Sequence, residues 1–376
     1  MLKSMNKQSV LSSLLKNKFN SKGFYFVFIF ILSTELNIFP NTFFVYSVIA
    51  LWGIVNLEFC KKNDTAIIAF LFLCMTSYVR IWQYNQRMLL DTSLLLMAIL
   101  PYVNNKKILI DVKVVNLFAI VFFLFSIYPQ LKFLSISSIA NFMIQSNLET
   151  ESSMLSFILP FFALYWFINK KWSLFIINVI FTIIAGKRIS VLGLFITSIL
   201  SITIKLYPLE FLKLKKIIPF IALFINIFYL LISYALVSGY LGDLIYELTG
   251  MSSNAFTMGR TSLYSEVFKE FDVYNSYDLL FGESKIYEIL ETKRIHNDVF
   301  VILMENGMIV FCVFWLLLYY KCNIISFPFI VLLNILFMTD NTLVYVPVIF
   351  CACFFIRLAN QYNQYLNYKF LKYYTP

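Results

Sequence analysis

Apolar runs close to the length that crosses a membrane recur from end to end of this chain of 376 residues. A helix needs about 20 apolar residues to span a bilayer, and hydrophobic residues make up 60% of the sequence whereas charged residues make up 13%. Because lipid offers no partner for open backbone groups, such a chain folds as a bundle of membrane-spanning helices. The sequence therefore predicts an all-α polytopic membrane protein, with residues 1–376 as a single integral membrane domain.

The apolar runs predict about twelve transmembrane helices, several of them shorter than usual. The first run follows a basic segment without a small-residue cleavage site after it, so we interpret it as a retained anchor. The seventh span can also be a helix broken near Gly186. The predicted spans are 24–39, 42–59, 65–79, 88–103, 113–128, 154–169, 172–186, 189–206, 217–238, 297–320, 324–339 and 342–357.

The distribution of Lys and Arg over the loops predicts the orientation, because cytoplasmic loops carry an excess of both. With both termini in the cytoplasm, 20 of the 30 basic residues lie inside. The same orientation places two long segments outside, a shorter loop at 129–153 and a large loop at 239–296 between spans nine and ten. In the large loop, the spacing of apolar residues over Thr261–Phe271 predicts a short amphipathic helix on the membrane surface.

Composition and missing motifs narrow the chemistry. The net charge of +10 suits anionic membrane lipids, and the basic residues are spread over loops without forming a stripe for nucleic acid. The chain has no phosphate-binding Gly-Lys-Ser/Thr loop, no Gly-x-Gly-x-x-Gly and no His-Glu-x-x-His. Its single histidine, and the lack of cysteine in the predicted outside loops, disfavour a zinc site. We therefore expect an outward-facing site of Arg, Lys, His and carboxylate, without metal or cofactor.

His296 is the only histidine, and it stands where the large loop re-enters a hydrophobic segment, between Arg294 and Asn297. Histidine changes its charge near neutral pH, so it can accept a proton from a hydroxyl. The alternative is a purely structural hydrogen-bonding role. Glu305 lies nine residues further on, inside the span, where a carboxylate requires a cation or a polar helix partner.

Lys187 and Arg188 are two adjacent cations that follow Gly186 at the outer end of a span. Their placement runs against the orientation bias, so a negative partner is expected. A lipid-linked pyrophosphate would supply one, and the guanidinium of Arg188 matches phosphate geometry. Alternatively, both side chains reach the lipid head groups by snorkelling.

Three further arginines are predicted to lie outside. Arg260 follows Gly259 just ahead of the predicted surface helix, a position that favours an anion; the alternative is a loop arginine paired with a nearby carboxylate. Arg80 and Arg87 flank a short outside loop with aromatic and amide side chains, which suits sugar or phosphate but also an ordinary interfacial belt. Two carboxylates near outer span ends are weaker candidates, Asp91 and Asp340.

Three stretches together resemble the Wzy-type polymerases of the O-antigen polymerase and ligase superfamily. The first is Gly186-Lys187-Arg188-Ile189-Ser190, similar to the basic turn of the family's outer face. The second runs from Gly259-Arg260-Thr261 to Leu279-Leu280-Phe281-Gly282-Glu283, and the third comprises His296-Asn297-Asp298-Val299-Phe300 and Leu303-Met304-Glu305-Asn306-Gly307. The chain departs from the family pattern at Glu283 and Ser284, where a second glycine is common, and at Val310.

The resemblance implies a metal-independent glycosyltransferase of lipopolysaccharide biosynthesis in the bacterial inner membrane. Such an enzyme joins oligosaccharide repeat units carried on undecaprenyl pyrophosphate, at the periplasmic face and without a cofactor. Arg188, Arg260 and Arg294 would hold the pyrophosphate, and His296 would orient or deprotonate the acceptor hydroxyl. Membrane lipids and a chain-length regulator protein are the implied partners. The other residues expected to contact the substrate are Lys187, Asn297, Arg80, Arg87 and Glu305.

Other functions remain open from the sequence. An O-antigen ligase of the same superfamily uses lipid A-core as acceptor and is poorly separated by sequence. A lipid-linked oligosaccharide flippase also has about twelve spans, but we would expect charges inside its bundle and no large outside loop such as 239–296. A permease or a non-enzymatic assembly subunit is the remaining alternative.

Overall fold

The computed structural model describes residues 153–359, apart from 185–186, 258, 272–275, 283–295, 321, 346–347, 350, 354 and 357–358. These described residues are all-helical and contain no strand, which confirms the predicted all-α class. In this described part of the chain, three helices are long and apolar enough to cross a membrane, α10 (Arg188–Leu206), α12 (Ile218–Val237) and α18 (Asp298–Tyr320). The five spans predicted before residue 153 lie outside the described residues.

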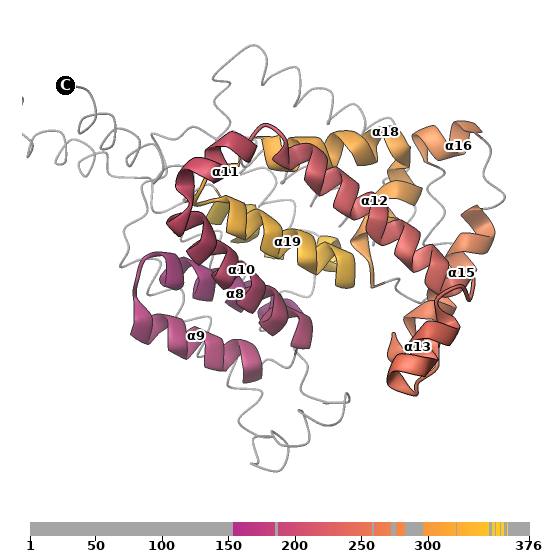
Figure 1. Cartoon of the computed structure of the whole chain (residues 1–376), viewed down its shortest axis with the longest axis horizontal. Coiled ribbons are helices and arrows are strands. Elements are labelled where there is room, and N and C mark those ends of the chain that lie inside the picture. Colours follow the sequence, from indigo (N-terminus) through magenta and orange to yellow (C-terminus); the bar gives the residue numbers. More distant parts are fainter. Residues whose placement is uncertain are drawn as a thin grey trace, which may run out of the picture.

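The helix α8 (Ser153–Ile168) forms the centre of the core. Its side chains Phe157, Phe161 and Trp166 are fully buried. After a turn at Lys170, which has a positive φ of 58°, α9 (Trp172–Ile184) packs back along α8. The helices α10 and α19 (Phe327–Thr339) also pack on α8, and α12 packs against α18 (Figure 1). The core is therefore built from helices before and after the large loop.

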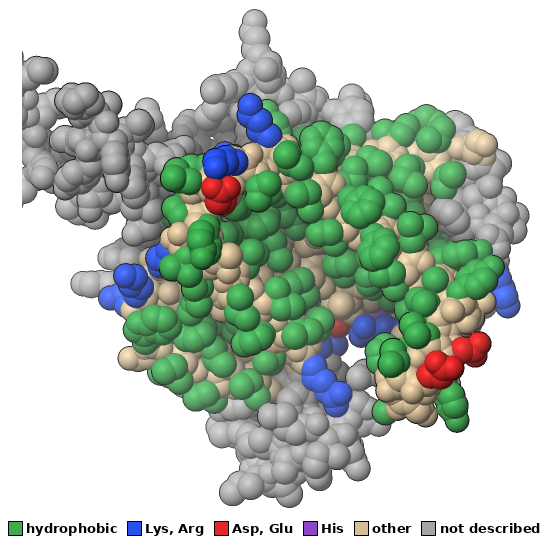
Figure 2. Space-filling view, viewed as in Figure 1, with side chains coloured by type: hydrophobic (Ala, Val, Ile, Leu, Met, Phe, Trp, Pro, Cys, Tyr) green, Lys and Arg blue, Asp and Glu red, His purple; other side chains and the backbone are tan. Residues whose placement is uncertain are grey.

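The outward surface of α9, α10 and α12 is apolar. Figure 2 shows hydrophobic side chains over these helices, with Lys, Arg, Asp and Glu gathered toward the edges, for example over α11 (Pro208–Leu214). An exposed apolar surface of this extent marks contact with lipid or protein. An apolar surface with charged side chains at its edges is expected of helices that face hydrocarbon. Its largest exposed side chains include Ile176, Leu192, Phe195, Phe220, Phe224, Phe228 and Leu231.

Polar side chains inside these apolar helices bond to their own helix. The side-chain amide of Asn178 donates to the carbonyl of Leu174 at 2.8 Å, and that of Asn226 donates to the carbonyl of Ala222 at 2.8 Å. The same pattern holds for the Thr197 hydroxyl, which donates to Gly193 at 2.7 Å. Bonds of this kind satisfy the donor without a partner from lipid, so these residues are compatible with a membrane span.

α18 is interrupted at Gly307, where the backbone has φ 76° and ψ 171°. At this break α16 (Ser276–Phe281) packs against α18. A Cβ on Gly307 would lie 2.3 Å from the carbonyl oxygen of Leu280, and a Cβ on Gly282 would lie 2.6 Å from that of Glu305. Both glycines are therefore required for the close backbone contact between the large loop and the broken span.

The described parts of the large loop contain four short helices, α13 (Gly242–Thr249), α14 (Ser253–Phe256), α15 (Arg260–Phe271) and α16. The helix expected near 261–271 is present as α15, but its apolar face packs against protein. Val267 is fully buried, and the ring of Phe268 contacts the rings of Tyr234 in α12 and Phe300 in α18. The expectation that this face lies on the membrane surface is therefore corrected.

The last two predicted spans begin later than the sequence suggests. In place of a start at 324, α19 begins at Phe327, because the side chain of Asn323 accepts hydrogen bonds from the backbone of Ile325 and Ser326, both at 2.8 Å, and holds a turn there. The predicted start at 342 falls in a 3-10 turn, Thr342–Val344. The described helical residues that follow include Val348 and Ile349.

Candidate functional site

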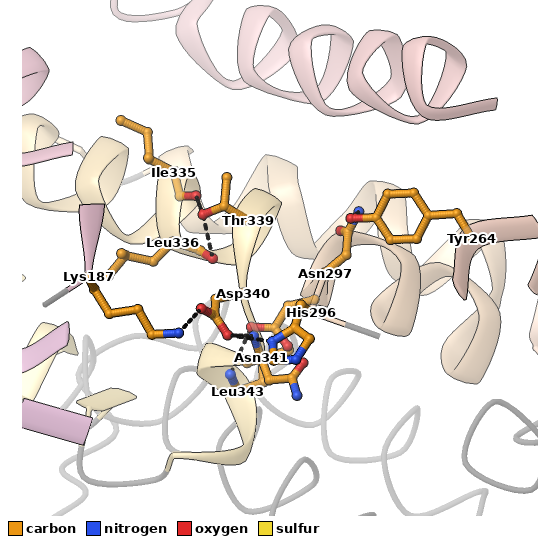
Figure 3. Close-up of polar contacts among 11 residues, drawn as sticks. Lys187, Tyr264, His296, Asn297, Ile335, Leu336, Thr339, Asp340, Asn341 and Leu343 are labelled. Carbon is orange, nitrogen blue, oxygen red and sulfur yellow. Dashed lines mark hydrogen bonds and ion pairs between the residues drawn. The ribbon is translucent and has the colours of Figure 1, made fainter. Parts of the chain in front are cut away.

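Asp340 connects the ends of three helices. Its Oδ1 lies 3.0 Å from Nδ1 of His296, and its Oδ2 lies 2.9 Å from Nζ of Lys187. Lys187 immediately precedes α10, His296 lies two residues before α18, and Asp340 immediately follows α19. Figure 3 shows the Asp340 carboxylate between the other two side chains. We call these three residues the Asp340 cluster.

The carboxylate of Asp340 is held in its ionised form. Burial by itself would raise its pKa, but the hydrogen bond from His296 and the positive charge of Lys187 outweigh burial and lower the pKa to about 2. The backbone N–H of Asn341 donates a further hydrogen bond to Oδ1 at 2.9 Å. Asp340 therefore carries a negative charge throughout the physiological pH range.

Lys187 lies inside this part of the protein. Its side chain is only 16% exposed, and its Nζ lies 5.6 Å from the centre of the Phe157 ring. The negative partner that the sequence led us to seek in a ligand is thus supplied by Asp340. Lys187 therefore forms its ion pair with the Asp340 carboxylate.

The imidazole of His296 is open on one side. Its side chain is 43% exposed, and Nδ1 is the ring atom that faces Asp340. In the neutral imidazole, a proton on Nδ1 that is donated to Asp340 leaves the lone pair on Nε2. A carboxylate in this position fixes the ring orientation and stabilises the imidazolium that forms when Nε2 takes a proton. The pair is suited to general-base chemistry.

Asn297 anchors His296 to the helix that follows. Its Oδ1 accepts hydrogen bonds from the backbone N–H groups of Val299 at 3.1 Å and Phe300 at 3.3 Å, which caps the start of α18. Its amide nitrogen donates to the hydroxyls of Tyr229 at 3.2 Å and Tyr264 at 3.3 Å. Asn297 is fully buried, so its contacts join α12, α15 and α18 and hold His296 in position.

Arg260 lies close to the two tyrosines that Asn297 contacts. Burial raises the pKa of Tyr264, while the hydrogen bond from Asn297 and the positive charge of Arg260 act to lower it. Arg260 is the first residue of α15, and no carboxylate among the described residues forms an ion pair with it. A guanidinium in this position is available to an anionic ligand.

Arg188 is exposed, in contrast to the lysine before it. It is the first residue of α10, where the helix dipole disfavours a cation and favours an anion. Within the part of the chain that the structure describes, Arg188 has no ion-pair partner either. An anion bound there would be stabilised both by the side chain and by the helix end.

The structure separates Glu305 from the Asp340 cluster. Glu305 is fully buried about two turns inside α18, where its backbone carbonyl touches Gly282. The carboxylate close to the cluster is Asp298, which is buried and accepts a hydrogen bond from the backbone N–H of Leu343 at 2.8 Å. Asp298 thus holds the chain that follows Asp340 against the start of α18.

Several predicted site residues lie outside the described residues, namely Arg80, Arg87 and Arg294. Of the predicted residues that are described, the structure brings together Lys187, His296 and Asn297, with Arg260 near the tyrosines that Asn297 contacts. Among the described residues, no group of three or more His, Cys, Asp or Glu could hold a metal ion.

Sequence reasoning placed Asp340 among the weaker candidates and did not single out Tyr229 or Tyr264. A carboxylate directly after an apolar run was the only available signal for Asp340. The two tyrosines resemble the interfacial aromatic residues of any membrane protein, so their sequence carries no signal. No protein-family model matches the chain, and no curated protein or solved structure is significantly similar to it.

Proposed function

We propose that this protein polymerises lipid-linked oligosaccharide repeat units on the outer face of a bacterial inner membrane. Its substrate is a glycan carried on undecaprenyl pyrophosphate, and its product is that glycan lengthened by one unit. The observation that carries the proposal is the open imidazole of His296, fixed by the ionised Asp340 at the end of the bundle that also presents the exposed Arg188.

The acceptor in this reaction is a sugar hydroxyl of the incoming lipid-linked unit. Nε2 of His296 takes the proton of that hydroxyl as its oxygen attacks the anomeric carbon of the growing chain. The bond between this carbon and the pyrophosphate oxygen breaks, and undecaprenyl pyrophosphate leaves with the electron pair. Because the imidazolium faces Asp340, the charge that develops on His296 is compensated within the protein.

The leaving pyrophosphate gains negative charge as its bond to the sugar breaks. Guanidinium groups that form paired hydrogen bonds stabilise such charge without a metal ion. Arg260 and Arg188 lack carboxylate partners among the described residues, which supports this role. In this proposal Lys187 and Asn297 position Asp340 and His296, and Arg294, Arg80, Arg87 and Glu305 remain proposed substrate contacts.

The proposed arrangement has twelve spans, cytoplasmic termini and the large loop 239–296 in the periplasm. The ends of the described helices support it, because the start of α10, the start of α18 and the end of α19 meet in the Asp340 cluster. The charge pattern predicts that all three of these helix ends lie on the outer side of the membrane. The large loop 239–296, which a flippase is not expected to have, favours an enzyme over a flippase.

Deletion of the gene in the bacterium that carries it separates the candidate functions. Loss of the proposed polymerase leaves single repeat units that still reach the surface attached to lipid A-core. Loss of a ligase leaves long polymer on undecaprenyl pyrophosphate and none on lipid A-core. Loss of a flippase leaves single units on the cytoplasmic face of the membrane. Either of the last two results would contradict the proposal.

A further inference from the structure

The large loop contains a helix whose apolar face is largely exposed in the described structure. One face of α13 is apolar, because its apolar residues recur at helical spacing: Leu244, Ile245 and Leu248, together with Leu241 just before the helix. The acidic pair Asp243/Glu247 lies on the opposite face. This helix is amphipathic although it contains only 8 residues.

The apolar side of α13 is exposed. Leu244 is 51% exposed and Leu248 is 75% exposed, and no residue of α13 is buried. The neighbouring Tyr240, Met251 and Phe256 are exposed as well. In α15, by contrast, the apolar face packs against α12 and α18. Of these two helices, α13 is therefore the one whose apolar face is open to a partner.

The position of α13 indicates the partner. Four residues (238–241) separate it from the end of α12, whose outward face exposes Phe224, Phe228 and Leu231. Figure 2 shows hydrophobic side chains over α12 and also over α13, where acidic side chains lie beside them. The turn between the helices is sharp, because Gly239 has a φ of 86° and its carbonyl accepts the backbone N–H of Gly242 at 2.9 Å. The open face of α13 thus continues the apolar surface of a membrane span.

We propose that α13 is a membrane-surface anchor, with Leu244 and Leu248 inserted at the boundary between lipid head groups and acyl chains. A helix of this length covers about 12 Å, which is too short to cross the hydrocarbon core. Burial of its apolar face in lipid removes exposed leucine from water, and Asp243 and Glu247 remain on the water side. With acidic residues on its polar face, α13 binds through apolar contact and needs no anionic lipid.

This anchor also sets the depth of Arg260. α14 follows α13 and is joined to α15 by side-chain contacts, since Thr257 and Thr261 share a hydrogen bond at 2.6 Å and Thr261 Oγ1 donates to the carbonyl of Ser253 at 3.2 Å. Lipid contact at α13 therefore fixes the start of α15 near the level of the head groups. The anchor does not depend on which reaction the Asp340 cluster performs.

A fluorescent probe tests the anchor directly. The variants Leu244→Cys and Leu248→Cys of the full-length chain are labelled with an environment-sensitive dye and reconstituted in phosphatidylcholine vesicles. Asp243→Cys and Glu247→Cys serve as matched controls on the opposite face of the same helix. The unsubstituted chain, labelled in parallel, gives the background from its six native cysteines.

At positions 244 and 248 we expect blue-shifted emission that is quenched by lipid carrying a nitroxide near its carbonyl groups. At positions 243 and 247 we expect water-like emission that is quenched by aqueous iodide. Iodide quenching at all four positions would overturn the proposal, because α13 would then lie in water. Protection of 244 and 248 from both quenchers would also overturn it, and would assign the face to another part of the chain or a second copy.

Discussion

His296 and Asp340 lie 44 residues apart in the sequence, yet Nδ1 of the histidine and Oδ1 of the aspartate are 3.0 Å apart. The second carboxylate oxygen contacts Lys187, which lies 153 residues before Asp340. A buried carboxylate that faces one fixed cation and one exposed imidazole is an arrangement for orienting the imidazole.

The ion pair between Lys187 and Asp340 is expected to stabilise the meeting point of α10 and α19. Lys187→Met and Asp340→Asn should each lower the free energy of unfolding, because each leaves a partly buried polar group without its partner. Such losses are about 3–5 kcal/mol for fully buried pairs, and the partial exposure of Lys187 places this pair at the lower end. Thermal unfolding in detergent measures the effect.

The double variant Lys187→Met/Asp340→Asn removes both charges together. We expect its loss of stability to be smaller than the sum of the two single losses. Polymer formation should nevertheless remain low, since His296 has lost its carboxylate. Strictly additive losses would show that the two side chains do not interact.

The low pKa of Asp340 predicts how stability depends on pH. A carboxyl group whose pKa falls from 3.8 to about 2 on folding stabilises the protein above pH 3.8. That contribution, on the order of 2 kcal/mol, is lost as the pH falls from about 4 toward 2. The difference in Tm between wild type and Asp340→Asn should therefore shrink as the pH falls below about 4. A difference that begins to shrink near pH 6 would contradict this assignment.

Gly307 is expected to tolerate no side chain. Gly307→Ala would place a Cβ 2.3 Å from the carbonyl oxygen of Leu280, at a residue whose φ is 76°. Gly239→Ala is a matched control, since Gly239 has a φ of 86° but no atom within 4 Å of its Cβ position. The control should lose about 1–2 kcal/mol from the positive φ alone, whereas Gly307→Ala should lose clearly more. Equal losses in thermal unfolding would show that α16 does not press against the break in α18.

Arg260 is expected to contribute to turnover and not to folding. Arg260→Ala should lower the rate of polymer formation by about 10²-fold, as the loss of one hydrogen-bond donor to developing charge does in other enzymes. Arg260→Lys should recover only part of the rate, because the ammonium group keeps the positive charge but cannot form paired hydrogen bonds with phosphate. Lys269→Ala, which removes an exposed cation from the same helix, is the control and should leave the rate unchanged. A similar loss in both alanine variants would point to a general effect of charge.

Apolar periodicity predicted the long apolar helices of the described part closely. The spans predicted at 217–238 and 297–320 correspond to α12 (Ile218–Val237) and α18 (Asp298–Tyr320). These boundaries could be predicted because polar or glycine-containing segments stand at both ends of the long apolar runs. The break inside α18 was not predicted, since Gly307 reveals its positive φ only when α16 packs against it.

The site could be predicted only in part. His296 stood out because it is the only histidine in the chain and stands at the edge of a span. Lys187 stood out because a cation at the outer end of a span requires a negative partner. That the partner is Asp340 depends on how α10 and α19 pack, and side-chain periodicity within each helix carries no information on pairing between distant helices. The same limit applies to Asn297, whose hydrogen bonds to Tyr229 and Tyr264 depend on how α12, α15 and α18 pack.

In the proposed reaction, His296 serves as the general base for the acceptor hydroxyl. The most direct measurement is the polymerisation rate of purified His296→Ala and wild type, at equal protein concentration, with an undecaprenyl-pyrophosphate-linked repeat unit as the only substrate. We expect the rate to fall by about 10²–10⁴-fold, with single units left unreacted although the variant is folded. Long polymer formed by His296→Ala at the wild-type rate would show that His296 is not the general base.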